Sequence, residues 1–518
     1  MKRLTRKWLV ALPAVTLVTA SVLGGCGSSD DGNKGTSAST TPSESTGTSA
    51  KPAATELKPV KLIWYYLGSR EGDAEQVYAK ANEIIKAKIN ATVDFQPLSN
   101  ADYRAKMPLK LAAGEKFDLA YTSDNVNLLP YRDSVSKGGF IALDELIAKY
   151  APQMKKAIPD NIWAATIIGG KIYAVPNYQI SARTPGLMFH KAIVDKYNLK
   201  DKIKAVKKMS DLTPIFELVK KAEPNMYMAM LQPSFDTLDN HEKETYVETL
   251  DANIPVVVDF NLKVHDKTQG AYLQLMLEDA KLAREWQVKG FFHPDSGLAK
   301  DVTPDQRAGK FFVTRDNAKP GVEADYKNKF GYEAYVVPMG LPVLSTASIS
   351  ATLTGISRTS ENPERAMMLL ELINTDKELY NLLVHGIEGV DYKKLGPNRV
   401  EPMPGKPYIG TAWAIGNQFN AWLLPGQEDD VWEQTKKVNS TAVPAPTIGF
   451  SFDSTNVQTE IANIISVSKK FDKTYQIGMV EDYTGLIAQY SKELQAAGLP
   501  KYIAELQKQL DAWKATKK

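Results

Sequence analysis

Hydrophobic and polar positions follow two alternating periods from residue 58 onward. Residues 60–66, 92–95 and 118–122 are short runs rich in β-branched and aromatic side chains, which predicts three strands. Between them, residues 73–89 and 101–113 repeat hydrophobic side chains three to four positions apart, which predicts two helices. This alternation predicts a parallel sheet covered by helices, and hence an α/β fold.

A second stretch of the same kind begins near residue 186. Its expected strands are residues 186–189, 227–231, 254–258, 311–314, 332–337 and 347–356. Its expected helices are residues 212–221, 272–288 and a segment opened by Ser360 and Pro363. The tail from residue 408 is aromatic and helical, with helices expected at 457–471, 483–497 and 501–517.

The first 57 residues have the pattern of an export signal and a tether. Residues 1–7 are basic, residues 8–23 are apolar, and the segment ends at Leu23-Gly24-Gly25-Cys26, which holds the only cysteine of the chain. These four residues resemble the lipobox of bacterial lipoproteins, in which the cysteine carries lipid (palmitate). An ordinary secretion signal with an incidental cysteine is the alternative. Residues 27–57 are mostly Ser, Thr and Gly, which predicts a disordered tether.

Composition narrows the class of protein. With 518 residues, 43% hydrophobic and 24% charged, the chain is neither collagen-like nor a multi-span membrane protein, and it is long enough for two or three domains. The 63 Lys and Arg nearly balance the 60 Asp and Glu, so no global field attracts nucleic acid. One cysteine excludes an internal disulfide.

The usual catalytic and cofactor motifs are absent from the sequence. It has no phosphate-binding loop, nucleophile elbow, HExxH motif or EF-hand loop, and its five histidines never stand at helical ligand spacing. We therefore expect no metal, cofactor or catalytic residue. Paired carboxylates such as Asp429 or Asp430 with Glu433 remain chance candidates for glycosidase chemistry, but a solvated helix start explains them better.

Aromatic and polar side chains gather where two expected strands end. The first strand ends in the run from Trp64 through Tyr66 to Arg70, and the third in residues 122–125. Ligands of open α/β sheets lie at the carboxyl ends of strands. We expect Trp64 to pack in the core, while Tyr66 fits either the core or a ligand.

Several segments together resemble the extracellular solute-binding proteins of bacterial carbohydrate ABC importers, in the branch of long lipoproteins with an extra C-terminal domain of uncharacterised function. They are residues 61–68, 117–119, 170–178, 308–311, 362–366, 386–392, 416–419 and 449–453.

The resemblance implies a two-lobed fold of the periplasmic-binding-protein type (type II), with hinge strands and helical C-terminal additions. The implied division is a signal peptide (1–25), the lipidated Cys26 with its tether (26–57), lobe one (58–178 plus 345–392), lobe two (182–340) and a C-terminal region packed mainly on lobe two (393–518). The implied crossings lie near residues 175–184, 335–346 and 389–404.

The resemblance also implies ligand contacts from both lobes and the first crossing. On lobe one and the crossing they are Tyr66, Ser69, Ser123, Asn125, Asn177, Tyr178 and Gln179. On the far side they are Gln232 (or Phe235), Arg315, Trp413 and Asn417.

The expected function is that of a monomeric receptor, lipid-anchored on the extracellular face of the cell membrane. It captures a sugar or oligosaccharide by hinge closure and delivers it to ABC permease subunits. The alternatives are a surface carbohydrate-active lyase or hydrolase, a receptor for peptides or other solutes, and a sensor subunit.

Overall fold

The computed structural model describes residues 57–124, 128–229, 247–251, 253–293, 302–405 and 408–516. All of these lie in the unit Leu57–Lys518, which holds its own hydrophobic cores. The expected lipidation site Cys26, the tether up to residue 56, and the expected contacts Asn125, Gln232 and Phe235 lie outside the described residues.

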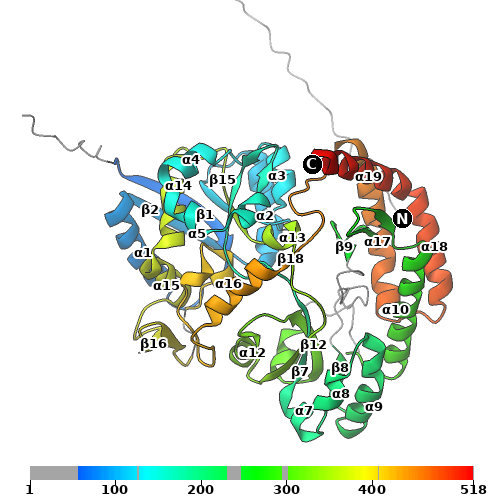
Figure 1. Cartoon of the computed structure of the whole chain (residues 1–518). Helices are drawn as coiled ribbons and strands as arrows, with labels where there is room; N and C mark the ends of the chain where they lie inside the picture. The colour runs from blue at the N-terminus through cyan, green and yellow to red at the C-terminus, as the bar shows by residue number, and fades with distance from the viewer. Residues whose placement is uncertain are drawn as a thin grey trace, which may run out of the picture. The chain divides into compact units, whose positions relative to one another are not determined.

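The first sheet has five strands in the order β2-β1-β3-β15-β6 (Figure 1). β1 pairs in parallel with β2 and β3, as the alternating pattern predicts, while β15 runs antiparallel to both β3 and β6. Later chain therefore returns to widen the sheet. The bounds are β1 (Val60–Leu67), β2 (Ala91–Leu98), β3 (Leu119–Thr122), β6 (Ala174–Pro176) and β15 (Leu353–Ile356).

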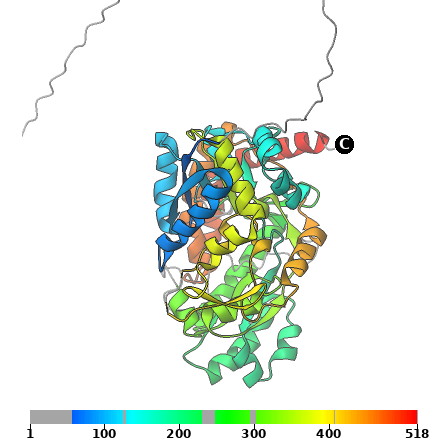
Figure 2. The same cartoon turned by 90° about the vertical axis from the view of Figure 1, so that its left-hand side faces the viewer.

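Helices cover the first sheet, and local signals set where they end. Ser99 accepts a hydrogen bond from the Asp102 backbone at the start of α2, and Gly114 ends that helix in the left-handed conformation. Figure 2 shows α1, α14 and α15 lying side by side. The bounds are α1 (Ala74–Ile89), α2 (Asn100–Ala113), α14 (Pro363–Thr375) and α15 (Lys377–His385).

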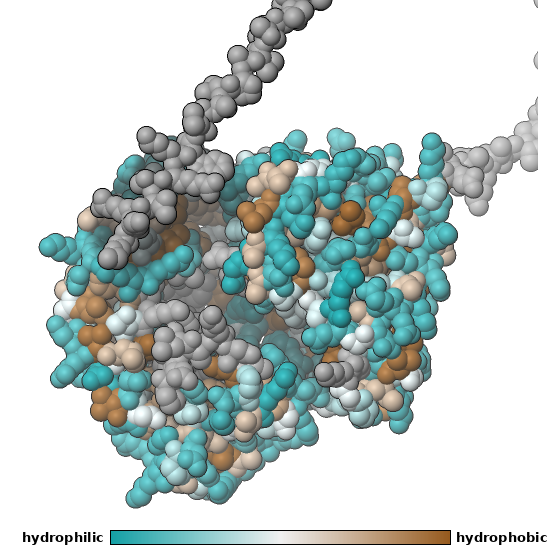
Figure 3. All heavy atoms as spheres, turned by 180° about the vertical axis from the view of Figure 1, so that it is seen from behind, coloured by the Kyte–Doolittle hydropathy of each residue, from teal (hydrophilic) through white to brown (hydrophobic). Residues whose placement is uncertain are grey.

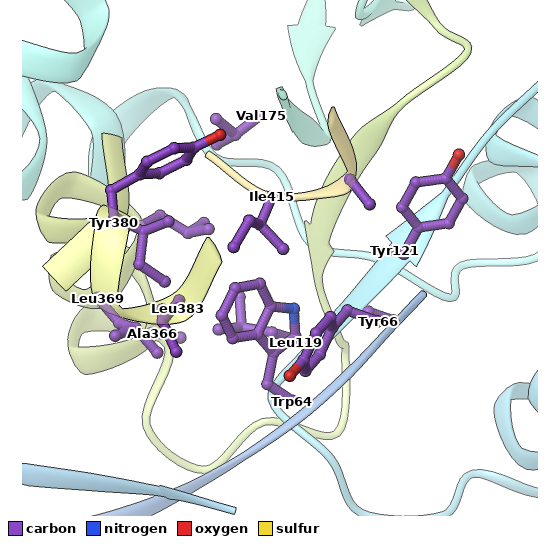
Figure 4. Close-up of a cluster of buried hydrophobic side chains, with 14 of the residues drawn as sticks. Trp64, Tyr66, Leu119, Tyr121, Val175, Ala366, Leu369, Tyr380, Leu383 and Ile415 are labelled. Carbon is purple, nitrogen blue, oxygen red and sulfur yellow. The ribbon is translucent and has the colours of Figure 1, made fainter. Parts of the chain in front are cut away.

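The core of this lobe is built around buried aromatic side chains (Figure 4). Trp64 is 1% exposed, as expected, and its ring packs 6.0 Å from Phe95. Tyr380 and Leu369 bring α15 and α14 into the same cluster. Burying such side chains stabilises a fold by about 1.5–3 kcal/mol each.

A second sheet, in the order β13-β7-β12-β8, carries a separate core. Phe189 of β7 and Phe312 of β12 pack with Phe216 of α9 and Trp286 of α10. The bounds are β7 (Pro185–His190), β8 (Tyr227–Ala229), β12 (Phe311–Asn317), β13 (Ala334–Pro338), α9 (Thr213–Ala222) and α10 (Gly270–Val288).

A third core joins the C-terminal helices to α10 (Figure 1). Two of the tail helices, α17 and α18, pack against α10, and the last one, α19, packs against these two. Met276 and Ala280 of α10 pack in this core, while Trp286 packs in the second. One long helix therefore ties the tail to the second sheet. The tail helices are α17 (Gln458–Gln476), α18 (Tyr483–Ala496) and α19 (Leu499–Thr516), beside β9 (Val247–Glu248), β10 (Val256–Asp259) and β11 (Val264–Asp266).

Two crossing segments link the two main sheets, and a third, through residues 443–444, leads from the first lobe to the C-terminal core. The Arg183 backbone exchanges hydrogen bonds with Val343 at 2.8 and 2.9 Å, and β14 (Val343–Leu344) pairs in parallel with β18 (Val443–Pro444). The first two crossings fall where we expected them. The third does not, because residues 392–402 form the hairpin of β16 (Tyr392–Gly396) and β17 (Arg399–Pro402).

The segment after residue 393 differs from the expectation that it packs mainly on lobe two. Tyr408, Ile415 and Phe419 lie in the core of the first lobe. Within residues 393–518, only the chain after the third crossing joins the C-terminal core. Part of the expected strand 347–356 is also helical, because Ser345 accepts from the Ser348 backbone in a capping box that starts α13 (Thr346–Ile349).

Candidate ligand-binding site

The candidate site lies where the carboxyl end of β3 meets the crossing segments. Tyr121 is 1% exposed, and its hydroxyl donates to the Ala351 carbonyl at 2.7 Å. Figure 4 shows it to one side of the core cluster, with the hydroxyl pointing away. Burial raises the pKa of Tyr121 well above its ordinary value, so the group stays neutral. The expected contact Ser123 lies two residues further along the chain and is buried.

Trp413 supplies the exposed aromatic surface of this site. Its side chain is 40% exposed, and its ring meets Tyr121 edge to face with centroids 6.4 Å apart. The Gln179 amide donates to the Trp413 carbonyl at 3.2 Å and to the Thr352 hydroxyl at 3.1 Å. The first crossing therefore fixes the backbone of the residue that carries the indole. A positioned, half-exposed Trp is a surface suited to stacking on a ligand.

Asn177 and Tyr178 position this loop from inside. The Asn177 amide donates to the Ala414 carbonyl at 2.8 Å, and the Tyr178 ring packs 4.6 Å from Phe419. Both side chains are buried. In this structure they support the segment that carries Trp413.

Asn417 and Gly416 complete the support of the loop. The Asn417 side chain is buried and accepts a hydrogen bond from the Phe419 backbone at 3.1 Å. Gly416 has φ +50°, and a Cβ there would lie 2.7 Å from the Ile373 carbonyl oxygen, so this close packing on α14 requires glycine.

The remaining expected contacts lie apart from this cluster. Tyr66 is 5% exposed and donates to the Tyr78 hydroxyl at 2.9 Å, so its side chain belongs to the core rather than to a surface at the sheet edge. Ser69 is exposed beyond β1, and Arg315 is half-buried on β12. The structure thus brings together Ser123, Asn177, Tyr178, Gln179, Trp413 and Asn417.

Sequence reasoning missed three polar residues of the crossings. Thr352 accepts from Gln179, as described above. Asn439 accepts from the Ser181 and Ala182 backbones at 2.8 and 3.1 Å and donates to the Gln179 carbonyl at 2.8 Å. Arg183 extends from the ladder of the first crossing. Each of these three residues stands in a segment with no recognisable motif, so its position at the crossings could be seen only in the folded protein.

The described residues show two further properties. Nowhere in the described ranges do three His, Cys, Asp or Glu side chains gather as metal ligands, and no described helix is long and apolar enough to span a membrane.

On the face in Figure 3, hydrophilic residues predominate and the surface is hollowed near its middle.

The chain belongs to the family of bacterial extracellular solute-binding proteins. The model of that family matches residues 71–378, more than half of the chain. A model for a domain of unknown function, DUF3502, matches residues 446–515, which hold the three tail helices. The expected family and its extra C-terminal domain are both confirmed.

Individual relatives agree with the family. A protein of Streptococcus pneumoniae serotype 4, named a carbohydrate ABC transporter substrate-binding protein, is 28% identical over 486 residues, covering 91% of this chain and 94% of the relative. The crystal structure of the N-glycan transport solute binding protein NgtS from S. pneumoniae has a TM-score of 0.78 at 26% identity, covering 89% of this chain and all of that one. Its complex with Man5GlcNAc has a TM-score of 0.72 at 25% identity, covering 89% and 99%. The expected two-lobed α/β fold is confirmed.

Proposed function

We propose that this solute-binding protein captures an oligosaccharide between its lobes and delivers it to an ABC permease. The observation that carries this proposal is the half-exposed Trp413 beside the first crossing. Its ring contacts Tyr121, and its backbone carbonyl accepts from Gln179. An indole face stacks on the apolar face of a sugar ring, while neutral amides and hydroxyls bond its rim. The relatives named for carbohydrate and N-glycan transport support the same ligand class.

Capture proceeds by closure of the two lobes about the crossings. The lobes have separate cores, and short ladders such as Arg183–Val343 and β14–β18 join them. A ligand that contacts both lobes binds the closed state better and shifts the population toward it. We propose binding and release with no bond broken, and no cofactor.

We also propose that the protein works outside the cell, anchored to the membrane. A signal peptide directs export, lipid on Cys26 anchors the monomeric chain to the outer face of the membrane, and the tether lets the lobes stand off that surface. As a flexible coil, a tether of 31 residues spans about 30 Å. This reach brings the lobes to a membrane permease.

The test is a thermal-shift screen of the unit Leu57–Lys518 against oligosaccharides, peptides and metal ions, followed by analysis of the sugars for breakdown. A ligand at 100 times its dissociation constant stabilises the folded state by about 2.7 kcal/mol. We expect a shift with one class of oligosaccharide, which is recovered intact. Recovery of cleaved sugar would indicate an enzyme, and a response to peptides alone would exclude the carbohydrate assignment.

A further inference from the structure

Arg183 places a cation in the hinge itself. Its backbone is fixed by the ladder to Val343, and the backbones on either side of it are held by Asn439 and by Asn317, which accepts from Thr184 at 2.7 Å. Its side chain is exposed to solvent. The surrounding protein nevertheless lowers the pKa of Arg183 by desolvation.

Arg183 lies on the same crossing segment that supports the proposed sugar site. It stands four residues after Gln179, whose amide donates to the Trp413 carbonyl at 3.2 Å. Arg183 and Tyr121 are close enough that the cation lowers the pKa of the Tyr121 hydroxyl, although burial raises it more. Tyr121 in turn contacts Trp413 edge to face. The order Trp413, Tyr121, Arg183 therefore runs from the exposed indole to the hinge.

Arg183 has no counter-ion in direct contact among the residues that the structure describes. Asp316 is the carboxylate that acts on it, but this side chain is exposed and accepts from the Asn317 backbone at 2.7 Å instead. Asp124, two residues after β3, pairs with Arg132 at 3.1 Å. Within the described ranges, the hinge thus holds a positive charge with no ion-pair partner in contact.

Closure of the lobes would remove more water from this guanidinium. Burying a charge costs free energy unless a partner replaces the lost water, and an arginine prefers a carboxylate that accepts two parallel hydrogen bonds. A neutral hydroxyl supplies a hydrogen bond but no counter-charge. A ligand that brings its own carboxylate removes the penalty of closure.

We propose that Arg183 binds a carboxylate of the captured oligosaccharide, so that the cleft selects an acidic sugar, either a uronic acid or a sialic acid. The inference rests on the proposed function and names the substrate class of the same site. Trp413 stacks on a ring, and Arg183 pairs with the acid at the hinge.

The test measures the binding of matched acidic and neutral sugars by calorimetry. Trigalacturonic acid is compared with its methyl ester, and sialyllactose with lactose, on the unit Leu57–Lys518. We expect one acidic member to bind more tightly than its neutral partner. Arg183→Gln is expected to reduce that preference by about 30-fold, which corresponds to about 2 kcal/mol, and added salt is expected to weaken it.

The matched control is Arg358→Gln, which removes the same charge. Arg358 is exposed and follows β15 at the edge where Ile356 pairs with Leu119, the opposite end of β3 from Thr122. We expect this variant to keep the preference. Both variants are expected to melt like the parent chain without ligand, because neither side chain is buried.

The outcomes separate the inference from the proposed function. Neutral sugars that bind as tightly as the acids, or a preference that survives Arg183→Gln, would overturn the role of Arg183 and leave the oligosaccharide receptor intact. If no acidic or neutral sugar binds, either in these pairs or in the wider screen, the proposed function is overturned as well. Whether the uronic or the sialic pair responds identifies the source of the carboxylate.

Discussion

At the residue scale, the candidate site combines one exposed side chain with several buried supports. Trp413 is 40% exposed, whereas Asn177, Tyr178 and Asn417 are buried and bonded within the protein. Substitutions should therefore separate into two classes. Changes at Trp413 act on the ligand, and changes at the supports act on folding.

Trp413→Ala is expected to weaken oligosaccharide binding at least tenfold with little loss of stability. The indole supplies the stacking surface, and a central aromatic anchor typically contributes 2 kcal/mol or more. Calorimetry with the ligand found in the screen, and urea unfolding without it, measure the two effects. Leu109→Ala, at a 70% exposed position on α2, is the control and should leave both unchanged. Equal affinity of the Trp413→Ala variant would remove Trp413 from the site.

Tyr178→Ala is expected to lower the free energy of unfolding by about 3 kcal/mol. The ring is 5% exposed and packs on Phe419, so its removal leaves a cavity. Tyr178→Phe keeps the ring and should cost about 1 kcal/mol or less. Urea unfolding of the two variants checks this order. A stable Tyr178→Ala protein would show that the loop does not depend on this contact.

At the element scale, the buried carboxylate of Glu248 is hydrogen-bonded to the end of the third crossing. Thr447, which follows β18, donates its hydroxyl to the Glu248 carboxylate of β9, and the other Glu248 oxygen has no hydrogen-bond partner among the described residues. Burial raises the pKa of Glu248 to about 7 from an ordinary 4.5. The link between crossing and C-terminal core is thus sensitive to pH.

This pKa makes the stability of the protein depend on pH in one direction. Between about pH 4.5 and 7 the folded chain holds a proton on Glu248 that the unfolded chain releases, so the free energy of unfolding falls as pH rises through that window, by about 3 kcal/mol in total. Glu248→Gln should remove that part of the slope. Urea unfolding at pH 5.5 and pH 8 measures it, with the exposed Glu401→Gln as the control. An unchanged slope in the Glu248→Gln variant would exclude Glu248 as its source.

At the scale of the whole molecule, the three largest hydrophobic cores are connected to one another by the crossings and by α10. The tail core is tied to the second sheet through α10 and to the crossings through Thr447. The tail helices therefore belong to the second lobe in packing. Residues 408–421 lie instead with the first lobe.

Cys26→Ala is expected to release the exported protein from the membrane. The lipid on this cysteine is the only proposed anchor, and the mature chain has a balanced charge that gives no attraction to anionic lipid. Fractionation of cells expressing either chain, with mass analysis of the mature N-terminus, tests this. Membrane retention of the alanine variant would show that another segment anchors the chain.

Local patterns in the sequence were enough to predict most of the helices and strands and the class of fold. The spacing of Val77, Ala81 and Ile85 places one buried face on α1, and Gly114 ends α2 where the pattern predicts. These signals need only neighbouring residues, because helical and strand periods are properties of the backbone. The segments that resemble the solute-binding family are also short stretches of neighbouring residues, so they could be recognised without the fold.

Contacts between segments far apart in the chain could be seen only in the folded protein. The third crossing runs through β18 rather than residues 389–404, and Tyr66 turns into the core while Trp413 faces out. Arg183 and Asn439 show no local motif, because their roles depend on partners far away in the chain. Such contacts are set by packing across the whole fold, which periodicity along the chain does not encode.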